Sequence, residues 1–126
     1  MSYTDADVVL ICFSISNPIS LQNVKEKWKP EVSHFCPRVP IVLVGLKKDT
    51  RTEKAILLEL EKRDIIPVSS EDGQQMAESI EAKSYVECSA KTGEAVQEVF
   101  EIAARASLTK RRRKPLTNGG WRCELI

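Results

Sequence analysis

The stretch VPIVLVGLKKDT, residues 39–50, contains the pattern that decides the fold. Its residues from Ile41 to Gly45 form an uninterrupted apolar run, and two lysines and an aspartate follow almost at once. A continuous rather than alternating apolar run is typical of a parallel strand that is covered on both faces. We therefore expect a buried strand here, with a Lys-x-Asp pair at its carboxyl end.

Two further apolar runs, VVLICF (Val8–Phe13) and SYVEC (Ser84–Cys88), predict strands of the same kind. Helical patterns separate or follow the three runs, and they cover residues 20–35, 52–64, 71–82 and 93–108. The order strand, helix, strand, helix, helix, strand, helix predicts an α/β fold. Right-handed crossovers would place helices on both faces of a parallel sheet.

Particular residues predict where these helices bend, begin and pack. Pro30 is expected to break or kink the first helix, because it has no backbone N–H to donate. Ser70 is expected to cap the helix that follows it. In the last helix an apolar stripe recurs at helical spacing and should pack on the sheet. Its members are Val96, Val99, Phe100 and Ala103.

Composition narrows the class of protein. The chain has 126 residues, 42% of them hydrophobic and 29% charged, which is ordinary for one globular domain. The longest uncharged apolar run is too short to cross a bilayer, and the start has no signal-peptide pattern. The cysteines show no C-x-x-C spacing, so we expect reduced, cytosolic thiols rather than a disulfide framework or a metal site. They are Cys12, Cys36, Cys88 and Cys123.

The charge is divided unevenly along the chain. Residues 1–109 hold 13 Lys/Arg against 17 Asp/Glu, whereas residues 110–126 hold 6 against 1. A mildly acidic body therefore carries a basic tail. Because that body offers no basic face, we expect no nucleic-acid partner.

The start of the chain leaves the first predicted strand without a neighbour. Val8 begins that strand with no covering element before it, and an exposed apolar edge favours aggregation. We therefore expect partner strands to be absent. On this interpretation the chain is the C-terminal part of a larger three-layer α/β domain.

Polar residues follow two of the predicted strands at the edge where ligands bind in open α/β sheets. Lys47-Lys48-Asp49 comes after one strand, and residues 88–93 (CSAKTG) come after another. A carboxylate has two acceptor oxygens, and guanine offers a matching pair of N–H donors along one edge, which adenine does not. Asp49 would thus select guanine, lysine stems would cover the base, and an amide near Ala90 would bond its carbonyl oxygen.

Each motif also has a simpler interpretation. A Lys-Lys-Asp triplet is common solvated charge at a strand end, and Ser-Ala-Lys is a routine turn before a helix. The two motifs are informative because they occur together, after successive buried strands.

The sequence resembles a known family at these motifs. KKD (residues 47–49) and ECSAK (residues 87–91) are similar to the N/T-K-x-D and S-A-K base-recognition motifs of Ras-like small GTPases. SYTDADVVLICFSI, PEVSHFCPRVPIVLVG and the segment from Thr50 to Ser70 resemble the Rho subfamily, which has an extra helix there. The resemblance implies that residues 1–108 are the C-terminal portion of a P-loop GTPase domain with a Rho-type insert helix.

The resemblance assigns roles to individual residues and implies GTP or GDP as the ligand. Lys47 would lie along base and ribose, and Asp49 would bind the guanine edge. Ser89 and Ala90 would hold the base loop, with Lys91 supporting it. Leu46 stands where the family has Asn or Thr, and an aliphatic side chain cannot make that position's hydrogen bonds.

The sequence has no motif for phosphoryl transfer. There is no G-x-x-x-x-G-K-[ST] and no D-x-x-G, so we expect no catalytic residues in this chain. We expect Mg²⁺ only together with the missing N-terminal half. A truncated gene model, an internal start or a deliberate short isoform would each explain this.

The full form, by resemblance, is a GTP/GDP switch acting on actin, cell-polarity or wall-building effectors. Exchange factors, GTPase-activating proteins and a dissociation inhibitor would regulate it. The alternative is a non-catalytic, membrane-anchored interaction module that cannot switch.

The tail, residues 109–126, predicts a membrane anchor. It contains a basic run, then PLTNGG as a flexible linker, then Cys123 four residues from the end. The ending CELI resembles a C-a-a-X prenylation box, in which Ile126 favours geranylgeranyl over farnesyl. The basic run would supply the second signal that one lipid needs at an anionic membrane. Its members are Lys110, Arg111, Arg112, Arg113 and Lys114.

We accordingly expect the protein at the cytoplasmic face of the plasma membrane or of an endomembrane, with a further pool in the cytosol. Alternatively, such a run is a solvated tail or a nucleic-acid patch, and a cysteine at this position occurs by chance.

Overall fold

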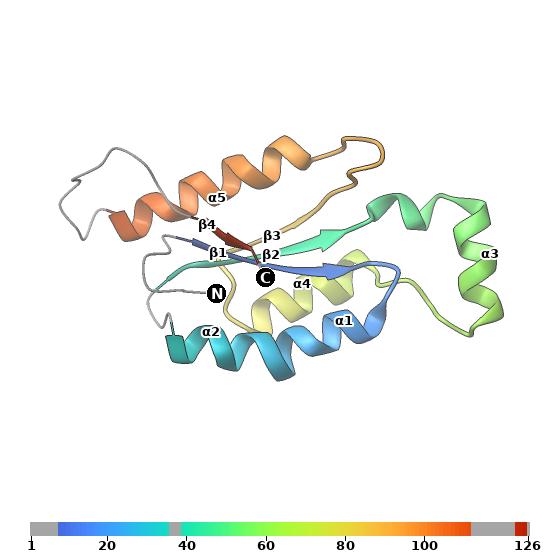
Figure 1. Cartoon of the computed structure of the whole chain (residues 1–126), viewed down its shortest axis with the longest axis horizontal. Coiled ribbons are helices and arrows are strands. Elements are labelled where there is room, and N and C mark those ends of the chain that lie inside the picture. Colours follow the sequence, from blue (N-terminus) through green and yellow to red (C-terminus); the bar gives the residue numbers. More distant parts are fainter. Residues whose placement is uncertain (1–7, 36–38, 112–122, 126) are drawn as a thin grey trace.

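The computed structural model describes residues 8–35, 39–111 and 123–125. Its centre is a parallel sheet whose strands lie in the order β3-β2-β1-β4. The expected α/β fold is confirmed, because helices cover both faces of this sheet (Figure 1). The strands are β1 (Val8–Ser14), β2 (Ile41–Leu46), β3 (Ser84–Glu87) and β4 (Cys123–Leu125).

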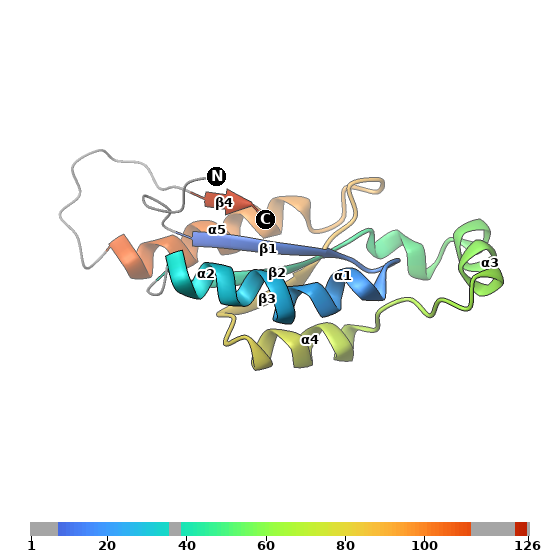
Figure 2. The same cartoon turned by 60° about the horizontal axis from the view of Figure 1, so that its bottom comes forward.

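The helices form two outer layers. Three of them, α1 (Pro18–Asn23), α2 (Lys29–Phe35) and α4 (Ser70–Ser79), lie on one face of the sheet, and α5 (Val96–Arg111) lies on the other (Figure 2). Helix α3 (Lys54–Lys62) belongs to neither layer and projects beyond the carboxyl ends of the strands. The domain is therefore three-layered, with one helix outside the layers.

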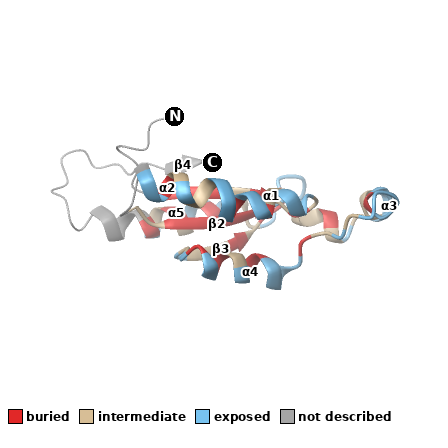
Figure 3. Cartoon of the chain, turned by 90° about the horizontal axis from the view of Figure 1, so that it is seen from below, coloured by how far each residue is buried: buried red, intermediate tan, exposed pale blue. Residues whose placement is uncertain are grey.

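Alternate residues of β1 supply the two halves of the core. Val9, Ile11 and Phe13 belong to the cluster beneath the three-helix layer, whereas Val8 and Leu10 belong to the cluster beneath α5. Successive side chains of a strand point to opposite faces, so an uninterrupted apolar run fills both layers. In Figure 3 the buried strands lie between helices whose outer sides are exposed.

The first helical segment stays helical through Pro30. It begins at Pro18, where the Asn17 side chain accepts bonds from the amides of Ile19 and Ser20. A π-helical turn, Val24–Trp28, then joins α1 to α2 and comes just before the proline. This wider turn is the local adjustment to a residue that cannot donate a main-chain hydrogen bond.

The expected cap of α4 is wrong by one residue. Ser69 is the N-cap, and its hydroxyl accepts from the amide of Asp72 at 3.1 Å. Ser70 is the first helical residue, and its hydroxyl instead donates to Glu87 at 3.1 Å. Two adjacent serines both fit the cap pattern, and a contact distant in sequence determines which of them caps.

The expected stripe of α5 is correct in part. Val99 and Ala103 are buried against the sheet with Ala106, and Val96 packs at the margin of that cluster. Phe100, however, is 57% exposed. Phe100 therefore lies at the solvent side of the face through which Val99 and Ala103 contact the sheet.

The chain's own end adds a strand that no sequence pattern predicted. The main chain of β4 pairs in parallel with β1, with Val8 opposite Cys123 and Leu10 opposite Leu125. The edge expected to be uncovered is therefore paired along its first three residues. The rest of the expected tail, with the linker and Arg112, Arg113 and Lys114, lies outside the described residues.

Two further expectations concern cysteines and membranes. Among the described residues, Cys12 and Cys88 form no disulfide bond, and Cys36 lies outside those residues. Within the described part of the chain, no helix is long and apolar enough to span a bilayer.

Candidate functional site

The residues that follow β2 turn sharply at the edge of the sheet. The Leu46 carbonyl accepts from the amide of Ile15 at 2.9 Å, which ends the strand. Lys47 then adopts a left-handed conformation, with φ of 63°, and a 3₁₀ turn runs from Lys48 to Arg51. We call residues 47–53 the first rim segment and residues 87–94, after β3, the second rim segment.

The two rim segments meet because β2 and β3 are neighbours in the sheet. The Lys48 amide donates to the Cys88 carbonyl at 3.0 Å. The Ser89 hydroxyl donates to Oδ1 of Asp49 at 2.7 Å. This hydrogen bond from Ser89 is the main reason that the pKa of Asp49 lies below its ordinary value. The carboxylate is thus oriented and held ionised.

The second rim segment is a compact turn around Ser89, which is fully buried. The Ser89 hydroxyl accepts from the Thr92 amide at 3.2 Å, and its carbonyl accepts from the Gly93 amide at 2.8 Å. Ala90 and Lys91 are exposed at the tip of the turn, as is Lys47 on the facing segment. Two predicted site residues therefore form a fixed centre, with three others around them on the surface.

Two ion pairs connect the outer parts of the segments. Lys91 pairs with Glu53, and Lys48 pairs with Glu94 at 2.8 Å. The hydrogen bond to its partner carboxylate is the main reason that the pKa of each lysine lies above its ordinary value. The other oxygen of Glu53, Oε2, is buried and has no hydrogen-bond partner among the described residues.

A third pair lies further inside. Arg51 forms two parallel hydrogen bonds with Glu87, at 2.6 and 2.7 Å, and two more with the Val68 carbonyl, at 3.0 and 2.7 Å. Its guanidinium also donates to the Ser70 hydroxyl at 3.1 Å. One arginine therefore joins the first rim segment to the end of β3 and to the start of α4.

Glu87 is the acceptor at the centre of this network. Burial alone would raise its pKa, but hydrogen bonds from Arg51 and Tyr85 outweigh burial and lower the pKa to about 2. The Tyr85 hydroxyl donates to Glu87 at 2.6 Å, and its ring stacks on Phe13. Burial, followed by this hydrogen bond, raises the pKa of Tyr85. The rim is thereby connected to the core.

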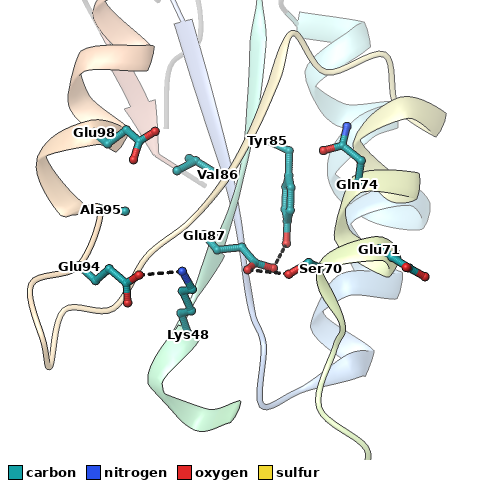
Figure 4. Close-up of a pocket in the computed structure, with 10 residues that line it drawn as sticks. All are labelled: Lys48, Ser70, Glu71, Gln74, Tyr85, Val86, Glu87, Glu94, Ala95 and Glu98. Carbon is teal, nitrogen blue, oxygen red and sulfur yellow. Dashed lines mark hydrogen bonds and ion pairs between the residues drawn. The ribbon is translucent and has the colours of Figure 1, made fainter. Parts of the chain in front are cut away.

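A groove of about 610 Å³ runs beside the network, along the outer edge of β3 between α4 and α5 (Figure 4). It shares Lys48, Glu87 and Glu94 with the rim but does not include Asp49 or Ser89. Its other polar lining includes Glu71 and Glu98. The groove is thus adjacent to the predicted base site and separate from it.

Several functional contacts were missed by sequence reasoning. Both segments contain residues of opposite charge: TRTE follows KKD in the first, and a glutamate precedes and another follows CSAK in the second. The two members of each ion pair, however, lie 36 to 46 positions apart in the sequence. No local pattern indicates such pairs. The missed residues are Arg51, Glu53, Glu87 and Glu94.

Of the predicted tail residues, Cys123 does not join this site. Cys123 lies in β4, beside the amino end of β1, whereas the rim lies at the carboxyl ends of the strands. The described residues contain no group of three or more His, Cys, Asp or Glu side chains arranged to hold a metal ion. The rim is therefore the only predicted site whose members the described residues bring together.

Comparison with known families agrees with this arrangement. A model of the Ras family matches residues 1–109. The match covers most of the chain, and the chain therefore belongs to the Ras family. Members of this family are small GTPases, which bind GTP and GDP and generally use Mg²⁺.

Proposed function

We propose that the rim binds the guanine base of GTP or GDP, as the base-recognition part of a Rho-type switch. The hydrogen bond from Ser89 to Asp49 carries the proposal, because it joins the two motifs at adjacent strand ends. It also orients a carboxylate that is ionised at neutral pH. An ionised carboxylate accepts two N–H bonds, and guanine has a matching pair of donors.

The neighbouring side chains fit a flat purine. Lys47 is exposed, so that its aliphatic stem can cover a base while its ammonium group remains in water, and Lys91, paired with Glu53, supports the base loop. Ala90 lies at the tip of the second rim segment, where its small side chain leaves its amide accessible to a base carbonyl. The bound nucleotide would contribute the phosphates on which hydrolysis acts. The residues that bind and orient the base are Lys47, Asp49, Ser89, Ala90 and Lys91.

The test is a titration of the 126-residue chain with GDP and with ADP, each with and without Mg²⁺. We expect guanine-selective binding, with selectivity that does not depend on Mg²⁺. Equal binding of GDP and ADP, or binding of neither, would contradict base recognition by the rim.

A single substitution makes the test specific to Asp49. An asparagine amide presents an acceptor and a donor group where the carboxylate presents two acceptors. The Asp49→Asn variant should therefore bind guanine nucleotides more weakly and shift its preference towards xanthine, whose second carbonyl accepts a hydrogen bond. We expect a loss of about 1–3 kcal/mol in GDP binding, the cost of an unpaired buried donor. Glu61→Gln, which removes one carboxylate from exposed α3, is the matched control.

The Rho assignment rests on helix α3. It lies between β2 and α4, where the Rho insert is expected, and it projects from the domain rather than packing in a layer. Exchange factors, GTPase-activating proteins, a dissociation inhibitor and effectors would be the corresponding partners. Binding of a Rho dissociation inhibitor by the prenylated chain, but not by a Ras-subfamily protein, would support this subtype.

A second candidate is a non-catalytic, membrane-anchored interaction module. The absence of a phosphate-loop motif from the 126 residues favours it. The titration with GDP and ADP distinguishes the two candidates, since the interaction module does not need to bind a nucleotide.

Both candidates include prenylation of Cys123 and attraction of the basic run to anionic lipid. Incubation with geranylgeranyl diphosphate and its transferase should add one lipid mass to the chain, and Cys123→Ser should abolish the addition. Modification of Cys123→Ser to the same extent would contradict this anchor.

A further inference from the structure

In the part of the chain that the structure describes, most of the ion pairs found lie at the rim. Four ion pairs occur among the described residues, and three of them join the first rim segment to the second. We call these three the cross-segment ion pairs. They are Lys48–Glu94, Arg51–Glu87 and Lys91–Glu53.

The side chain of Leu46, just before the first rim segment, is relevant to these ion pairs. It stands at the start of the turn, 37% exposed, and its aliphatic side chain can make no hydrogen bond to the facing segment. Apart from the ion pairs, the segments are joined by the hydrogen bond from the Lys48 amide to Cys88 and by the one that Asp49 accepts from Ser89. Electrostatic pairing therefore adds to these two hydrogen bonds in holding the segments together.

The three pairs differ in their exposure. Arg51–Glu87 is the most buried, with side-chain exposures of 23% and 10%, whereas Lys48–Glu94 has 37% and 58%. Salt screens exposed charges strongly and partly buried charges much less. The outer pair should therefore respond to ionic strength, while the inner pair keeps the segments close.

We propose that the cross-segment ion pairs are positioning residues, which set the distance between the two rim segments before a nucleotide binds. None of the three carboxylates needs to touch the base. A rim that is already ordered loses less conformational entropy when it binds a ligand. This proposal rests on the proposed guanine site for its effect on affinity, but the ordering itself is a property of the ligand-free chain.

The outer pair allows a charge-swap test. Lys48→Glu and Glu94→Lys each place like charges opposite one another, whereas the double variant restores an attractive pair in the opposite orientation. Both positions are accessible to solvent, so these substitutions are compatible with folding. Glu59→Lys is the matched control, because it makes the same charge reversal in the exposed Glu59–Arg63 pair of α3.

The first measurement is hydrogen exchange in the ligand-free chain at the amides of Thr92 and Gly93, which report opening of the second rim segment. Each single variant should exchange about two- to fivefold faster there at low salt. The double variant and Glu59→Lys should match the wild type. Failure of the swap to restore slow exchange, or equal effects of Glu59→Lys, would overturn the proposal.

The second measurement is GDP affinity of the same variants at low and high salt. The single variants should bind about two- to fivefold more weakly at low salt, with unchanged preference for guanine over adenine, and the difference should shrink as salt rises. A loss of base preference in a single variant would contradict a positioning role. If the wild type binds no guanine nucleotide, the proposed function fails, and hydrogen exchange still decides whether the pairs order the rim.

Discussion

Helix α3 and the rim of the sheet each contain an arginine–glutamate pair, and the two pairs have different surroundings. Arg63, the C-cap of α3, lies one helical turn after Glu59, and both are more than half exposed, with 3.2 Å between Nη2 and Oε1. Arg51 and Glu87 come from segments 36 positions apart and form two hydrogen bonds between the first rim segment and the end of β3. The same two residue types thus form an exposed surface ion pair in one region and a partly buried ion pair between two chain segments in the other.

The difference shows where local sequence determines structure and where packing does. On α3 the two partners lie one helical turn apart, so the helix alone brings them together. At the rim, Arg51 and Glu87 meet only where the first rim segment lies beside the end of β3. Substitutions that look alike in the sequence should therefore have different effects in the two regions.

The largest difference should appear on removal of a leucine side chain. Leu43 in β2 is fully buried, and Leu43→Ala should reduce the free energy of unfolding by about 2–5 kcal/mol, from lost transfer energy and the cavity left behind. Leu58 on α3 is 60% exposed, and Leu58→Ala should change it by no more than about 0.5 kcal/mol. Urea denaturation of both variants measures the contrast. Similar costs would mean that α3 packs against something in solution.

A glycine in α4 should give the next largest effect, with an unusual sign. Replacing an interior helical glycine by alanine ordinarily stabilises a helix by about 0.5–1 kcal/mol. At Gly73 the new methyl group would overlap the Tyr85 ring and hydroxyl. Displacing that ring disturbs its bond to Glu87, so Gly73→Ala should cost about 1–3 kcal/mol.

Gln74→Ala is the control for Gly73→Ala, because Gln74 is exposed at the adjacent position of the same helix. Thermal unfolding should show it neutral or slightly stabilising. A stabilising Gly73→Ala would show that Tyr85 is not fixed between α4 and the sheet.

Glu87 should make stability depend on pH in a defined window. Its pKa falls from 4.5 to about 2 on folding, so the unfolded chain binds more protons between these values. The stabilisation is complete above pH 4.5 and is lost as pH falls towards 2. Glu87→Gln should remove this dependence and lower stability at neutral pH, because Arg51 loses its ionised partner.

The control for Glu87→Gln is Glu98→Gln, which removes the same charge from the groove at an exposed position. Chemical denaturation from pH 2 to pH 7 should give this control the wild-type slope. An unchanged acid slope in Glu87→Gln would contradict the assignment of the window to Glu87.

The sequence predicts the sheet well for a physical reason. Val8–Ser14 and Ile41–Leu46 are buried on both faces, and such strands are recognisable as continuous apolar runs. Asp49 and Ser89 were also predictable to lie together, because the ends of parallel strands share one edge. The ion-pair partners Arg51, Glu53, Glu87 and Glu94 were not predictable, since each contacts a residue far away in the sequence.

Other misses have the same cause. The burial of α5 residues depends on the angle at which the helix meets the sheet, and its stripe alone did not exclude Phe100. The three residues of β4 have no periodicity to detect, and only the edge of β1 defines them as a strand.

The smallest effect should come from the pair on α3, and it completes the comparison. Glutamate four residues before arginine is the favourable order on a helix, but exposed pairs of this kind contribute only about 0.2–0.5 kcal/mol. Arg63→Ala should therefore reduce stability by no more than about 0.5 kcal/mol in low salt and by less in high salt. Arg51→Ala, measured beside it by urea denaturation, should cost several times more and change little with salt, because its bonds to Glu87 and Val68 are partly buried. Equal costs, or equal salt dependence, would mean that burial does not distinguish the two pairs, and the rim would then be as loosely held as the surface of α3.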